Sequence, residues 1–131
     1  MVIAPDLSIL ESRFYVVTIP EAKKPLFTEA RTVSLKDKQS YGWALRIKTD
    51  RKKLKYTEVL VAPAPLTHWG IAKNTSISKD RKTATSNREW IADTKWLGNF
   101  WGVSPSDPPG NYEFRISIDG IPVQTYGFTI Q

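Results

Sequence analysis

The chain of 131 residues contains no cysteine and only one histidine. The absence of cysteine excludes disulfide bonds, thiol nucleophiles and thiolate zinc sites, so the fold must be stabilised by packing and hydrogen bonding. A zinc site needs about three or four ligands, and one histidine among scattered carboxylates does not supply them. The sequence therefore predicts no metal and no cofactor.

Long apolar runs are also missing. The longest, Val59 to Leu66, is interrupted by Pro63 and Pro65 and is far shorter than the roughly 20 residues of a membrane helix. Residues 1–12 contain no lysine or arginine and do not resemble a signal peptide. We therefore expect no membrane span, and the missing signal peptide favours a cytoplasmic location.

No catalytic constellation is visible. His68 lies in a loop-like stretch without a Gly-x-Ser-x-Gly context, so we expect a structural or surface histidine. Glu89 and Asp93 are the closest carboxylate pair on an aromatic-bearing segment. On a strand they would lie about 13 Å apart, which exceeds the roughly 5–9.5 Å between the carboxyl groups of glycosidases. The sequence predicts that the protein is not an enzyme.

The chain does contain a succession of short β-patterned segments. In the clearest, residues 41–49, Trp43 and Leu45 fall on one face and Arg46 on the other. Strands are predicted over residues 14–19, 29–35, 41–49, 54–62, 75–78, 83–91 and in a hairpin over 112–130.

The segments between and before these strands are expected to be irregular. Residues 1–13 read as a loosely ordered N-terminal arm and residues 94–106 as an aromatic-rich connection. The prediction is a single all-β domain over residues 14–131, an antiparallel sandwich of seven or eight strands.

The terminal hairpin has an internal conflict. Asp119-Gly120 between two alternating apolar runs is a strong signal for a two-residue loop. Such a loop would place Tyr126 and Phe128 on the face opposite to that of Phe114, because a one-residue shift turns every side chain over. We expect either a β-bulge within residues 124–127 or a three-residue loop with Gly120 in the left-handed region.

Two features resemble immunoglobulin-like and fibronectin type III-like domains. Pro109-Gly-Asn-Tyr112, followed by an alternating strand and an Asp-Gly turn, looks like the last two strands of those families. Tyr112 occupies the position of the "tyrosine corner", whose hydroxyl bonds the backbone upstream. Trp43 resembles their core tryptophan. The resemblance implies an immunoglobulin-like sandwich, as in single-domain bacterial proteins, and no particular function.

Positive charge is concentrated on the hairpin around residues 46–55. The formal net charge is +6. The cations of the predicted hairpin are Arg46, Lys48, Arg51, Lys52, Lys53 and Lys55. A cationic hairpin tip can contact nucleic-acid phosphates. A solvated strand face that discourages edge aggregation is the simpler interpretation.

The five tryptophans divide into three expected roles. Trp43 is predicted for the core, and Trp90 and Trp96 are predicted to plug the open end of the sandwich. Trp69 and Trp101 are candidate anchors for a partner, because exposed aromatic side chains bury a large area at low entropic cost. Phe100, beside Trp101, is a third candidate anchor.

These observations favour a non-catalytic interaction domain. We expect it to bind another protein through aromatic loops at one end, with Trp69, Phe100 and Trp101 as anchors and the basic residues 51–53 for steering. Two alternatives stay open: a carbohydrate-binding module that uses exposed tryptophans, and electrostatic binding of nucleic acid by the basic hairpin. The sequence does not predict the oligomeric state.

Overall fold

The computed structural model describes residues 1–18, 24–67, 69 and 73–131. Within these residues the chain forms eleven strands and no helix, so they contain no helix that could cross a membrane. The strands are β1 (Val2–Ala4), β2 (Leu7–Thr18), β3 (Leu26–Glu29), β4 (Thr32–Val33), β5 (Ser40–Thr49), β6 (Lys53–Val61), β7 (Thr75–Ile77), β8 (Thr83–Ile91), β9 (Trp96–Gly102), β10 (Gly110–Ile118) and β11 (Ile121–Ile130).

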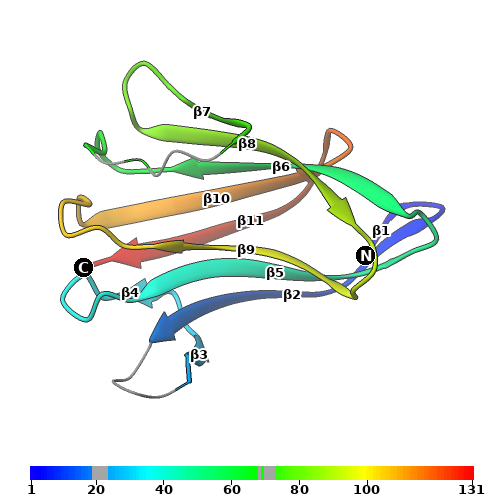
Figure 1. Cartoon of the computed structure of the whole chain (residues 1–131), viewed down its shortest axis with the longest axis horizontal. Helices are drawn as coiled ribbons and strands as arrows, with labels where there is room; N and C mark the ends of the chain where they lie inside the picture. Colours follow the sequence, from blue (N-terminus) through cyan, green and yellow to red (C-terminus); the bar gives the residue numbers. More distant parts are fainter. Residues whose placement is uncertain (19–23, 68, 70–72) are drawn as a thin grey trace.

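The strands form two packed sheets (Figure 1). Sheet A has the order β1-β2-β5-β9, with β3 also paired to β2, and sheet B has the order β4-β11-β10-β6-β8-β7. The pairings between described strands are antiparallel except that of β11 with the two-residue strand β4. The predicted all-β sandwich is confirmed. The strand count is higher than predicted because β1, β3 and β9 lie in segments for which no strand was expected.

Residues 1–13 are not the loosely ordered arm that we expected. They form β1 and the first half of β2, where Leu7 and Ile9 are buried in the core. The register of β2 against β5 shifts around Leu10, which has no partner on β5. This bulge interrupts the apolar alternation, so the pattern does not indicate a strand.

Residues 94–106 also differ from the expected connection, because they contain β9. This strand pairs with β5 over its whole length, from Trp96 opposite Arg46 to Gly102 opposite Ser40. Glycine has low strand propensity, and Gly98 and Gly102 conceal the alternation in the sequence.

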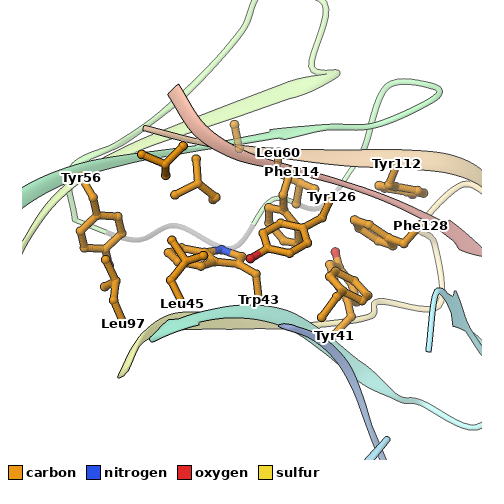
Figure 2. Packing of buried hydrophobic residues seen from close by; sticks show 14 of the residues in the cluster. Tyr41, Trp43, Leu45, Tyr56, Leu60, Leu97, Tyr112, Phe114, Tyr126 and Phe128 are labelled. Atoms are coloured by element: carbon orange, nitrogen blue, oxygen red, sulfur yellow. The ribbon is translucent and has the colours of Figure 1, made fainter. Parts of the chain in front are cut away.

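Aromatic side chains fill the space between the sheets (Figure 2). Trp43, on β5, is fully buried as predicted. Tyr41 on the same strand packs against Phe128 of sheet B, with 4.8 Å between ring centroids. Phe128 also stacks on Tyr112 at 5.5 Å. The Tyr112 hydroxyl donates a hydrogen bond of 2.6 Å to the carbonyl oxygen of Pro108, the bond that the resemblance implied.

The terminal hairpin combines a two-residue loop with a bulge. Asp119 and Gly120 have φ values of 50° and 79°, as a type I′ turn requires. Val123 has no partner on β10, so the register shifts there. The predicted bulge is present, but it lies just before the expected range 124–127. It turns Tyr126 and Phe128 toward the core.

Buried tyrosines make the stability of this fold sensitive to alkaline pH. Burial raises the pKa of Tyr41, and the negative charge of Asp107 raises it further. Burial also raises the pKa values of Tyr56, Tyr112 and Tyr126. In the unfolded chain a tyrosine ionises near pH 10. Above that pH the unfolded state releases protons that the folded state keeps, so stability falls as pH rises.

We expect the free energy of unfolding, measured by urea denaturation, to fall steadily above about pH 10. Below about pH 9 these tyrosines should contribute no slope, since they are protonated in both states. In Tyr41→Phe the fall above about pH 10 should be less steep than in the wild type, because one shifted group is gone. A free energy that stays level through this range would contradict the prediction.

Candidate functional site

A buried carboxyl group joins the two sheets. Glu58, on β6, is 1% exposed. Its Oε2 atom accepts hydrogen bonds from Trp43 Nε1 at 2.6 Å and from Asn99 Nδ2 at 2.9 Å. Its Oε1 atom accepts a bond of 2.8 Å from Trp101 Nε1. Three N–H donors of sheet A thus satisfy a polar group that would be costly to bury alone.

The strand alternation of β6 explains why a glutamate occupies the core. Glu58 lies between Tyr56 and Leu60 in the set of residues that faces sheet A. Sequence analysis missed it because β6 reads as mixed on both faces. The every-second-residue spacing of residues 54, 56, 58 and 60 could have indicated that Glu58 faces the core. It could not have identified the hydrogen-bond donors on β5 and β9.

Two of the expected anchors belong to this interior network. Trp101 is half-buried, and its indole N–H points to Glu58. Trp69 is 8% exposed, packs edge-on against Trp101 with 5.9 Å between ring centroids, and donates a hydrogen bond to the carbonyl oxygen of Arg81. Trp69 therefore lies inside the fold and Trp101 lies partly inside it, and the N–H of each ring finds an acceptor there.

The third expected anchor, Phe100, is exposed on the outer face of sheet A. It is 40% exposed, and Phe27 of β3 is 54% exposed. Their ring centroids lie 5.7 Å apart in an edge-to-face arrangement, and Phe27 makes the same kind of contact with Tyr15 of β2 at 5.9 Å. We refer to Tyr15, Phe27 and Phe100 as the aromatic patch. Sequence analysis did not identify Phe27 or Tyr15 as members of a site.

A glycine fixes the geometry of the aromatic patch. Gly42 of β5 is paired with Tyr15 on one side and with Phe100 on the other. A Cβ atom at this position would lie 2.5 Å from the Phe100 ring. Only glycine therefore lets the Phe100 ring lie across β5 toward β3. The patch is a set of rings laid on a strand surface and not a flexible loop.

The remaining tryptophans have different surroundings. Trp90, which was predicted to plug the open end of the sandwich, is partly buried and packs against the core. Trp96, for which the same role was expected, is 39% exposed. It lies on β9 four residues before Phe100, so the two side chains share the outer face of sheet A.

Three of the six cations of the basic hairpin, Arg46, Arg51 and Lys53, are paired with carboxylates of the described residues. Arg51 contacts both Asp6 oxygens, through Nε at 2.8 Å and Nη2 at 2.9 Å, and also binds Asp119. Lys53 lies 3.7 Å from Glu89. The hydrogen bonds from Arg51 hold the pKa of Asp6 below its usual value. Arg51 thus connects three turns, instead of presenting a free charge.

The expected anchors and the expected steering residues are not adjacent. The β5–β6 turn, which carries Lys52 as an exposed residue, lies at the end of the sandwich where β1 begins (Figure 1). Phe100 is paired with Gly42 near the start of β5, whereas this turn follows the end of β5. His68 lies outside the described residues. Among the described residues, no group of three or more histidine or acidic side chains could hold a metal ion.

The hydrogen bonds to Glu58 predict a specific loss of stability. Glu58→Gln replaces one acceptor oxygen by an NH2 group, which would face an indole or amide donor. We expect the free energy of unfolding at neutral pH to fall by about 1–3 kcal/mol, as when buried donors lose their acceptor. Glu113→Gln, at a partly exposed position on β10, is the matched control and should change it by less than about 0.5 kcal/mol. Equal effects of the two substitutions would contradict the role of Glu58.

Comparison with known proteins identifies the fold. A family model described as the PM0630 beta sandwich domain matches residues 12–131, so the chain belongs to that family. Among solved structures, the chain is similar to an immunoglobulin-like protein (PA1606) from Pseudomonas aeruginosa. The TM-score is 0.71 at 10% identity, over 96% of this chain and 97% of that chain. A search of curated proteins finds no match. The immunoglobulin-like sandwich implied by Tyr112 and Trp43 is confirmed.

Proposed function

We propose that this member of the PM0630 beta sandwich domain family is a non-catalytic interaction domain that binds another protein through the outer face of sheet A. The observation that supports it is the aromatic patch, in which Phe27 and Phe100 are 54% and 40% exposed. Exposed aromatic side chains that gather on one face are typical of protein-binding sites.

The patch is organised for binding before a partner arrives. Its three rings are held by mutual edge-to-face contacts and by the space above Gly42. Little side-chain freedom is left to lose on binding, so more of the buried area contributes to affinity.

Charged pairs flank the patch on the same sheet. Arg13 and Glu29 lie 2.9 Å apart, and Arg46 and Glu11 lie 3.5 Å apart. An apolar centre surrounded by solvent-exposed ion pairs matches the usual composition of a protein interface.

This surface replaces the loop ends that we expected from the sequence. Arg51 and Lys53 are paired with carboxylates, which leaves Lys52, within the described part of the chain, as the unpaired cation among residues 51–53 and weakens the case for steering or nucleic-acid binding by this hairpin.

A photoreactive phenylalanine analogue at position 27 tests the proposed surface. We expect irradiation of cells that naturally produce the protein to give a discrete crosslinked product with one partner protein. The analogue at Ile91, which is 60% exposed on sheet B, should not give this product. Phe100→Ser, combined with the analogue at position 27, should weaken crosslinking about tenfold, as expected for an aromatic hot spot.

Thermal unfolding of each variant shows whether the fold is retained, so a lost product can be attributed to the surface. Identical products from positions 27 and 91, or no product from position 27, would contradict the proposal.

A glycan-binding role is a second candidate, supported by Trp96. Trp96 and Phe100 share the outer face with only Gly98 between them on that side, and strand rise places them about 13 Å apart. Aromatic rings along such a surface can stack on sugar rings.

We expect titration with a panel of oligosaccharides to quench tryptophan fluorescence, and Trp96→Ala to remove most of the response. Unchanged fluorescence across the panel would exclude this role.

A further inference from the structure

β9 is the long free edge of sheet A. It has seven residues, and no described strand pairs with its second side. The other strands at sheet edges, β1, β3, β4 and β7, have only two to four residues. A long edge exposes unpaired N–H and C=O groups that can bind another strand.

The hydrogen bonds at both ends of β9 show which groups are free. The carbonyl oxygen of Lys95 accepts a bond of 2.8 Å from Ile47 N, and Val103 N donates a bond of 3.2 Å to Gln39 O. Bonded and non-bonded pairs alternate along an antiparallel ladder. The odd-numbered residues therefore bond to β5, and the even-numbered residues of 96–102 direct their N–H and C=O groups away from the sheet.

All four residues with outward-directed backbone groups are exposed. They are Trp96, Gly98, Phe100 and Gly102. Gly98 and Gly102 leave the backbone uncovered, and the Phe100 ring lies over Gly42, away from the edge. Within the part of the chain that the structure describes, these four positions of the edge are therefore accessible to another backbone.

Three of the usual protections of an edge strand are missing from β9. Residues 96–102 contain no charged residue and no proline, and the pairing with β5 has no bulge. Natural sheets commonly protect long edges by one of these features. An unprotected edge of this length indicates a surface that another chain covers.

Sheet B extends further than sheet A on the side of β9, and this difference limits which kind of chain could pair with β9. Asn99 and Trp101 bond to Glu58, so β9 lies opposite β6. Sheet B continues beyond β6 with β8 and β7 (Figure 1). A single strand beside β9 would lie opposite β8. A second copy of the whole sandwich would bring its own β8 and β7 into the same space.

We propose that an extended segment of the partner protein adds to sheet A as an antiparallel strand beside β9, the mode known as β-augmentation. The proposal rests on the proposed function and specifies how the partner is held. The segment is uncharged, because its side chains would lie next to the uncharged residues 96–102. Its outward apolar side chains would continue the aromatic patch.

The sequence of β9 itself supplies a suitable probe. A peptide with the sequence of residues 95–103, aligned antiparallel about Asn99, pairs all four free residues of β9 with even-numbered peptide positions. Trp96 then lies opposite peptide position 102, and Phe100 opposite position 98, so each aromatic residue faces a glycine. This alignment gives the largest number of backbone hydrogen bonds without crowding.

N-methylation of the peptide tests strand addition directly. We expect the fluorescently labelled peptide to bind the full-length chain in an anisotropy titration. Methylation at peptide positions 98 and 100 removes two N–H donors that face β9 and should weaken binding about tenfold or more. Methylation at positions 97 and 99, which face away from β9, is the matched control and should change affinity less than about threefold.

A protein variant provides a second test. Gly102→Pro removes an N–H that faces outward, and a Cβ atom there would meet only Ser40 Oγ at 3.8 Å. It should weaken peptide binding about threefold or more, while thermal unfolding shows that the fold is retained. Absence of binding by the unmodified peptide, or equal loss with both methylated peptides, would overturn strand addition. Crosslinking at position 27 tests the aromatic patch independently of β9. A crosslinked product can therefore form even if the peptide does not bind.

Discussion

The position of β9 depends on the buried carboxyl group of Glu58. Its two oxygens accept bonds from Trp43, Asn99 and Trp101, which lie on two neighbouring strands of sheet A. A buried acceptor is stable only while its donors stay in place, so these bonds fix which side of β9 faces the core. With Asn99 and Trp101 inward, the even-numbered residues of β9 must face outward. The exposure of Phe100 and Trp96 follows from this orientation.

Because side chains alternate between the two faces of β9, neighbouring aromatic residues of this strand lie on opposite sides of sheet A. Trp101 and Phe100 are adjacent in sequence, but one contributes to the interior and the other to the surface. The same alternation decides which backbone groups bond to β5 and which remain at the edge. The two exposed aromatic side chains of β9 therefore belong to the same set of even-numbered residues as the free backbone groups, which is why the aromatic patch and the open edge adjoin.

Local features of the sequence predicted those parts of the fold that depend on local geometry. The Asp119-Gly120 turn and the position of Tyr112 are set by backbone preferences within a few residues, and both were predicted. The aromatic patch was not, because it requires the pairing of β2, β3, β5 and β9 to bring residues from three parts of the chain together. Likewise, the ion pairs of Arg51 form only where three distant turns meet.

The absence of cysteine has a consequence for where a binding surface can lie. A sandwich of this size without crosslinks is stabilised mainly by buried apolar area, and aromatic side chains bury the most. Trp69 and Trp101, although they lie near chain segments that connect strands, are drawn into the interior because each indole also finds an acceptor there. The rings left outside are those that strand alternation directs away from the core. The proposed recognition surface therefore lies on a sheet face and its edge, where backbone geometry holds the rings.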